Sequence, residues 1–283
     1  MDINRRGKNS KAIMKLFKFS MIMCVLCAIM YLAISCMSTQ DKLLLDASEI
    51  DLIQYDVPKD DATVVIFETT KGTMKAVIYE DEAPDYCKYF KSLVKDGYYD
   101  DTYYFYIEDE APAYSMGGAK DSDGDDTDDT DTTTFEIEKS NNMWPFKGAL
   151  ATFGGKKGIF KKRNLAGSRL MFINSVEFDE DFIEEIRDVD GNEELIETFI
   201  VKGGVPNFSQ QFTIFGQIYE GFDTLESITT AEIDDKNHPK EEIKIIKAYL
   251  STYGENRCEN ESEFFCHVSM PKSVDSDSDS SEK

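Results

Sequence analysis

Short runs of apolar and β-branched residues, separated by turn-forming residues, dominate the middle of the chain. Residues 63–67 (T-V-V-I-F) and 73–79 (T-M-K-A-V-I-Y) predict two strands. The polar residues 68–72 between them, which end in Lys-Gly, predict a hairpin. A further apolar run, 243–250, predicts the last strand of the domain. The pattern therefore favours a domain that is mainly β.

Two stretches have a helical period instead. In residues 80–95, Pro84 suits the first turn of a helix, and Tyr86, Phe90 and Leu93 recur on one side. Residues 177–206 carry spaced apolar residues in an acidic background, which predicts an inserted helix or two. The expected architecture is a β-structure with flanking helices.

The first 35 residues have the pattern of a secretory signal. Residues 1–18 are basic and polar, and residues 19–35 carry no charge. Cys36 follows the residues L-A-I-S, which resembles the lipobox of bacterial lipoproteins, and the resemblance implies that Cys36 is lipidated. The alternative is an uncleaved signal anchor, because the apolar run is close to the minimum of about 17 residues that spans a bilayer. Either way, we expect a membrane-anchored protein outside the cytoplasm.

Polar and acidic segments flank the predicted domain. Residues 36–61 predict a tether, and the folded domain is expected from Ala62 to Leu250. Residues 251–283 predict an acidic, disordered tail. Within the tail, Cys258 and Cys266 could pair in an oxidising compartment, whereas Cys87 is expected to be buried in the helix.

The charge of the chain excludes some partners. The formal net charge is −24, which makes nucleic acid an improbable ligand. Solubility explains such a surface most simply, and binding of cations or of a basic surface is the alternative.

An acidic loop, residues 119–134, has part of the spacing of a calcium loop. Asp121, Asp123 and Asp125 match the first ligands, but Asp126 stands where glycine is needed and Thr132 where glutamate is needed. We therefore predict a solvated loop with no metal site, and no cofactor.

Four segments, in this order, resemble the cyclophilin-type peptidyl-prolyl isomerases. They are G-Y-Y-D-D-T-Y-Y-F-Y with the later Gly117-Gly118, then K-G-A-L-A, G-S-R-L-M-F-I and F-T-I-F-G with the following E-G-F-D. The resemblance covers residues 62–250. It implies a closed antiparallel β-barrel.

The same resemblance implies the positions of the site, and most of its residues are changed. Tyr106 stands where the family has its catalytic arginine, and Arg169 where it has a glutamine. The implied substrate-binding positions are Phe105, Met116, Phe153, Met171 and Phe212. One hypothesis is that Arg169 supplies the missing guanidinium from a neighbouring strand. The simpler alternative is that it is a surface charge paired with an acidic neighbour.

These observations lead to three hypotheses about function. The first is an isomerase or foldase, weak or inactive, that acts on proline-containing exported polypeptides. The second is a non-catalytic module that binds a peptide or a surface protein on the same fold. The third is an acidic surface protein whose loops bind cations.

Overall fold

The computed structural model describes residues 43–47, 49–108, 113–124, 133–157 and 163–258. The predicted signal, Cys36 and Cys266 lie outside these residues. In the part described, no helix is both long and apolar enough to cross a membrane.

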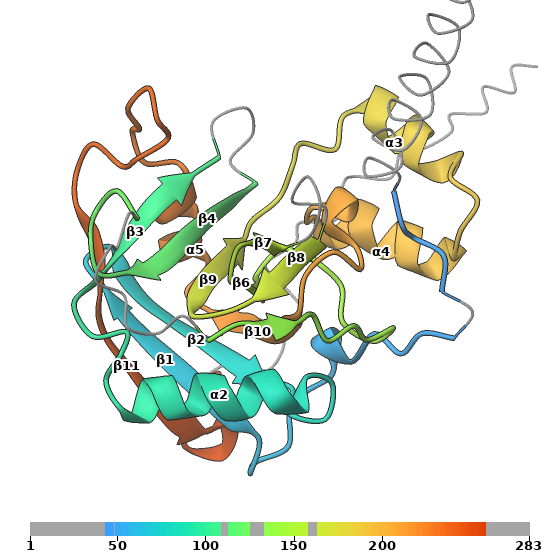
Figure 1. Cartoon of the computed structure of the whole chain (residues 1–283). Helices are drawn as coiled ribbons and strands as arrows, with labels where there is room; N and C mark the ends of the chain where they lie inside the picture. Colours follow the sequence, from blue (N-terminus) through green and yellow to red (C-terminus); the bar gives the residue numbers. More distant parts are fainter. Residues whose placement is uncertain (1–42, 48, 109–112, 125–132, 158–162, 259–283) are drawn as a thin grey trace, which may run out of the picture. The chain divides into compact units, whose positions relative to one another are not determined.

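A closed antiparallel barrel forms the centre of the molecule (Figure 1). This confirms the fold class expected from the sequence. The order of the strands around the barrel is β1-β11-β3-β4-β9-β6-β10-β2. Their bounds are β1 Thr63–Thr69, β2 Gly72–Ile78, β3 Thr102–Ile107, β4 Tyr114–Ala119, β6 Ala149–Phe153, β9 Arg169–Ile173, β10 Ile214–Glu220 and β11 Ile243–Thr252.

The predicted hairpin joins β1 and β2, with Val65 opposite Ala76. Gly72 closes it with φ of +141°, and a Cβ atom there would lie 2.3 Å from Thr224 Oγ1. Glycine is therefore required by both backbone conformation and space.

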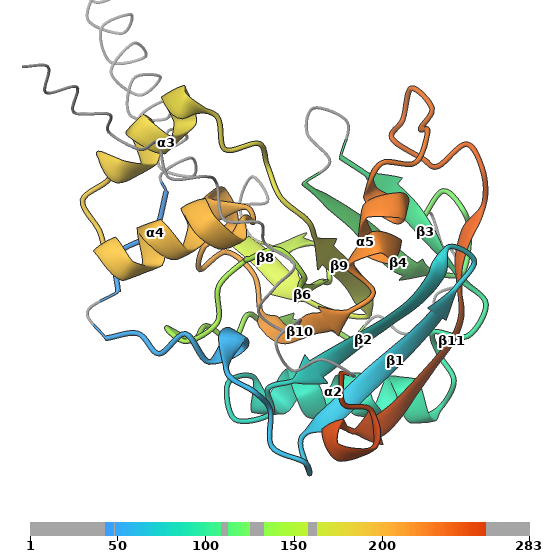
Figure 2. The same cartoon turned by 180° about the vertical axis from the view of Figure 1, so that it is seen from behind.

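Two helices complete the interior of the barrel. Helix α2 (Pro84–Lys95) has its proline in the first turn, as predicted, and buries Tyr86 and Phe90. Helix α5 (Phe222–Thr229) buries Leu225 and Ile228. All four side chains join the same core cluster as the inward-facing residues of the strands. Helix α2 lies beside β11, and Figures 1 and 2 show it from opposite sides.

The predicted inserted segment contains α3 (Glu180–Arg187) and α4 (Glu193–Lys202), followed by the 3₁₀ turn η2 (Pro206–Phe208). A small sheet lies beside the barrel, in the order β5 (Phe135–Glu136), β8 (Arg163–Ala166), β7 (Lys156–Lys157).

The folded unit begins earlier than predicted. Residues 43–61, which the sequence assigned to a tether, pack on the domain, and we call them the strap (residue 48 lies outside the described part). Leu45 is only 1% exposed and Ala47 only 8%. Both pack with Leu195 and Phe199 of α4. The apolar residues of the strap thus bury their surface against the insertion, so Ala62 is not the domain boundary.

The C-terminal boundary also lies later than predicted. Strand β11 continues to Thr252, and the 3₁₀ turn η3 (Tyr253–Glu255) buries Tyr253. The tail therefore does not begin at residue 251. Cys87 is buried in α2, as expected.

Candidate functional site

The outer surface of the barrel carries an apolar cluster of its own. Side chains alternate along a strand, so in β9 Leu170 and Phe172 enter the barrel core while Met171 and Ile173 face outward. Buried residues of β6, β9 and β10 form the floor of this outer cluster. Five half-buried side chains that lie on it are Tyr114, Met116, Phe153, Phe208 and Phe212.

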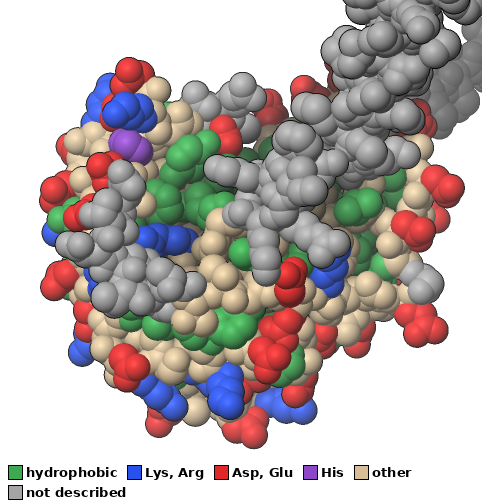
Figure 3. Space-filling view, viewed as in Figure 1, with side chains coloured by type: hydrophobic (Ala, Val, Ile, Leu, Met, Phe, Trp, Pro, Cys, Tyr) green, Lys and Arg blue, Asp and Glu red, His purple; other side chains and the backbone are tan. Residues whose placement is uncertain are grey.

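Five of the rings at this surface form a continuous series, which we call the aromatic row. Successive ring centroids lie 5.8 Å apart from Tyr106 to Tyr114, 5.2 Å from Tyr114 to Phe208, 5.1 Å from Phe208 to Phe212 and 6.4 Å from Phe212 to Phe153. These spacings are typical of interacting aromatic pairs. Figure 3 shows hydrophobic side chains gathered over β3 and β4 on the face seen in Figure 1.

An irregularity in β3 brings Tyr106 to this row. Tyr104 pairs with Gly117, but the register shifts so that Tyr106 pairs with Met116. Met116 in turn lies opposite Met171 of β9. Three predicted site residues on three neighbouring strands therefore lie side by side.

The structure does not bring Phe105 and Arg169 into the row. The Phe105 ring lies against the start of the acidic loop, because a Cβ atom on Gly124 would be 2.3 Å from it. The Arg169 guanidinium carbon lies 5.9 Å from the same ring. Its Nη1 donates to the Gly118 carbonyl and to the Tyr98 hydroxyl, both at 3.0 Å. That guanidinium is therefore bonded to β4 and to the turn that precedes β3.

The row offers neutral phenols as its polar groups. The Tyr106 hydroxyl donates to Glu108 Oε2 at 3.4 Å. Burial, and secondarily Tyr106 and Glu108, raise the pKa of Tyr114 well above its usual value. Tyr114 therefore stays protonated at neutral pH and can offer one O–H donor.

Comparison with known proteins identifies the family of this domain. A family model described as "cyclophilin type peptidyl-prolyl cis-trans isomerase/CLD" matches residues 64–250, more than half of the chain. The chain belongs to this cyclophilin family. The segments that resemble the family in sequence lie in β3, β4, β6, β9 and β10 and at the start of α5. Three of the five residues in the aromatic row, Tyr106, Phe153 and Phe212, are positions that the resemblance implied.

Two curated proteins and one solved structure are similar to this chain. A protein of Staphylococcus epidermidis named "putative peptidyl-prolyl cis-trans isomerase" is 28% identical over 188 residues, which cover 66% of this chain and 91% of the relative. A protein of the same name from Staphylococcus aureus is 27% identical, with 64% and 88% covered. A crystal structure of a cyclophilin type peptidyl-prolyl cis-trans isomerase from Cryptosporidium parvum aligns with a TM-score of 0.49 and 21% identity, covering 68% of this chain and 98% of that one.

Two members of the row were not among the predicted cyclophilin-site residues. Two extra residues before Gly117 left the position of Tyr114 open in the sequence. Phe208 lies on η2 and packs on Phe212, four residues later. Helical periodicity could not have found this pair, because η2 ends at Phe208 and Gln210 between the two rings has a φ of +59°.

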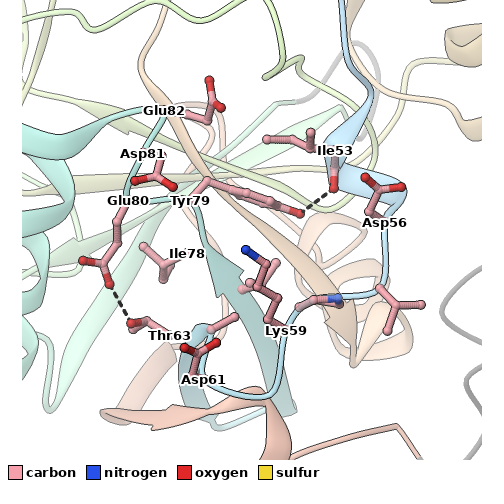
Figure 4. Close-up of a pocket in the computed structure, with 14 residues that line it drawn as sticks. Ile53, Asp56, Lys59, Asp61, Thr63, Ile78, Tyr79, Glu80, Asp81 and Glu82 are labelled. Carbon is pink, nitrogen blue, oxygen red and sulfur yellow. Dashed lines mark hydrogen bonds between the residues drawn. The ribbon is translucent and has the colours of Figure 1, made fainter.

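A separate hollow lies between the strap and the end of β2 (Figure 4). Its volume is about 490 Å³, and the residues around it include Asp56, Asp61, Glu80, Asp81 and Glu82. Hydrogen bonds from Lys91 and Thr63 lower the pKa of Glu80. In the described part of the chain, no group of His, Cys, Asp and Glu side chains is arranged to hold a metal ion. No predicted site residue lines this hollow.

Proposed function

We propose that this cyclophilin-family protein is a foldase-like protein of the cell surface with weak or absent isomerase activity. Its ligands are proline-containing or apolar segments of exported polypeptides, bound on the aromatic row. The observation that carries the proposal is the end of that row, where the position implied for a catalytic arginine holds Tyr106, stacked on Tyr114.

The chemistry of prolyl isomerisation explains why this change matters. Rotation about the peptide bond faces a barrier of about 18–20 kcal/mol. A site lowers that barrier by placing donors where charge develops in the transition state. A guanidinium offers a charged fork of donors, whereas a phenol offers a single neutral one.

Binding without catalysis is supported by the row itself. Apolar rings bury ligand surface without needing a charged group, and they suit proline and aromatic side chains. The alternative function, a non-catalytic module for an extended peptide or a surface protein, therefore uses the same residues.

An isomerisation assay on a short X–Pro peptide tests the catalytic part. We expect a rate at least about 10²-fold below that of a family member with the arginine, since loss of one preorganised donor typically costs about 10²–10³. Tyr106→Arg should not restore activity, because Phe153 and Phe212 still occupy the row. A fast wild-type rate that collapses in Arg169→Ala would contradict the proposal and show that Arg169 is catalytic.

Peptide binding is measured separately, by fluorescence anisotropy of a labelled X–Pro peptide. Phe212→Ser should weaken binding, since it removes the ring that joins Phe208 to Phe153. Phe178→Ser is the matched control, because Phe178 packs beside α3 in a different cluster. Equal losses in both variants would contradict binding on the row.

The cell-surface part rests on the sequence around Cys36. We expect the protein to incorporate labelled fatty acid and to lose the label in Cys36→Ser, while Cys27→Ser keeps it. A single acyl chain binds membranes only marginally, so the mature protein should carry more than one. Label that persists in Cys36→Ser would contradict lipidation at this residue and favour the signal anchor.

A further inference from the structure

The C-terminal residues beyond the described part have the composition of a ligand for this site. Residues 264–271 read F-F-C-H-V-S-M-P, an apolar block that ends in an X–Pro bond. Residues 275–282 follow as D-S-D-S-D-S-S-E, an acidic block. The tail thus offers two aromatic rings and a proline, followed within a few residues by four carboxylates.

One end of the aromatic row lies beside a basic edge. Asn164 Nδ2 in β8 donates to the Gln211 carbonyl at 3.0 Å, which places β8 next to Phe212. In the backbone pairing of β7 and β8, Lys156 lies opposite Asn164 and Lys157 opposite Arg163. Three cationic residues therefore lie at this edge, in a chain whose net charge is −24. An apolar surface followed by a basic edge matches the order of the two blocks in the tail.

The tail is long enough to reach this surface. The described chain ends at Cys258, whose Sγ lies 3.7 Å from the Tyr219 carbonyl near the end of β10. Phe212 lies just before the other end of β10, about 23 Å away at about 3.3 Å per residue. An extended chain from Cys258 spans about 20 Å to Phe264 and about 43 Å to Pro271. The apolar block can therefore cover the row, and the acidic block can continue to β7.

We propose that residues 264–271 occupy the aromatic row in the same molecule, and that the acidic block binds the basic edge of β7 and β8. This inference rests on the proposed function, that the row binds apolar X–Pro segments. It adds that the tail of the same chain competes with external peptides for the row. A short tether holds its ligand at an effective concentration of about 1 mM, so even weak docking excludes much of an external peptide.

The first test compares the full chain with a variant that lacks residues 259–283, both in detergent. The probe is the labelled X–Pro peptide. We expect the truncated protein to bind the probe about tenfold more tightly, because the tail no longer competes for the row. Replacing Asp275, Asp277 and Asp279 by Asn should give part of that gain, and replacing Ser276, Ser278 and Ser280 by Ala should give none. Equal affinity of the full and truncated chains would overturn the proposal and leave peptide binding intact.

A second measurement does not depend on the probe. Chymotrypsin cleavage after Phe264 and Phe265 should be slow in the full chain and fast in Phe212→Ser, with Phe178→Ser like the wild type. That result, without probe binding by any variant, would support the tail in the row and refute binding of external peptides. Cleavage that is equally fast in all three proteins would overturn the proposal. Protection that appears only as protein concentration rises would also overturn it, because the tail would then dock on a second copy.

Discussion

At the scale of single residues, Gln54 links the strap to the barrel and to the segment around Trp144. Its side chain is 1% exposed. The side-chain Nε2 donates to the Trp144 carbonyl at 3.0 Å and to Gln217 Oε1 at 2.9 Å, and Oε1 accepts from the Trp144 amide at 2.6 Å. Gln54 therefore satisfies buried polar groups of two other segments.

Gln54→Ala should lower the free energy of unfolding by about 2–4 kcal/mol, because it leaves the Trp144 amide and carbonyl buried without this partner. Gln54→Glu should also be destabilising, since a carboxylate cannot donate to the two oxygens. Urea unfolding of each variant measures the effect.

The matched control for Gln54 is Gln211→Ala, whose side chain bonds across an exposed turn to Asn207. We expect a change within about 0.5 kcal/mol there. A loss in Gln54→Ala no larger than in this control would show that the strap is not held by this network.

The same scale shows what sequence could predict about the site. The segments that resemble the family imply which strands are neighbours in the barrel. They therefore predicted that five residues lie near one another: Tyr106, Met116, Met171, Phe153 and Phe212. Phe105 was also predicted to belong there, but the register shift after Tyr104 leaves its ring beside Gly124. A local irregularity of this kind depends on packing between strands, which periodicity does not encode.

At the scale of elements, the insertion and the strap stabilise each other. The Asn192 side chain accepts from the Leu195 amide and caps α4, while its backbone N–H donates to the Leu45 carbonyl. The start of the helix is thus fixed by a cap and by the strap together.

Leu45→Ala should destabilise the protein by about 2–5 kcal/mol, the usual cost of a cavity at a buried leucine. Leu44→Ala is the natural control, because Leu44 is 44% exposed whereas Leu45 is 1% exposed. We expect a change within about 0.5 kcal/mol for the control. Thermal unfolding of the two variants compares their stabilities. Equal losses of stability would show that residues 43–47 are a loose tether.

Strands and helices were predictable at this scale because hydrophobic residues recur with a different period in each. The strap was not, because its apolar residues have no regular spacing and their partners lie far away in the sequence. Leu45 packs on Leu195 and Phe199, which belong to a different part of the chain. A short apolar run such as Leu43-Leu44-Leu45 predicts burial without naming the partner.

At the scale of the whole molecule, the acidic surface makes calcium binding a property to test. Only the start and the last residues of the acidic loop lie in the described part, and Asp125 is outside it. We expect millimolar calcium to shift the melting temperature by less than about 1 °C, because a solvated loop gains no folding free energy from the ion. A shift of several degrees, lost when Asp121, Asp123 and Asp125 are replaced by Asn, would instead support cation binding.

Closure of the barrel has a consequence for when the protein can fold. The first strand pairs with the last, with Thr63 opposite Thr252. Such a contact between the two ends of a domain makes folding slow, because loop entropy is lost before the contact forms. Because synthesis proceeds from the N-terminus, β1 lacks this partner until nearly the whole domain has been made. Until then one edge of β1 is exposed, and an exposed strand edge favours aggregation. Completion of β11 late in synthesis therefore removes the exposed edge that favours aggregation.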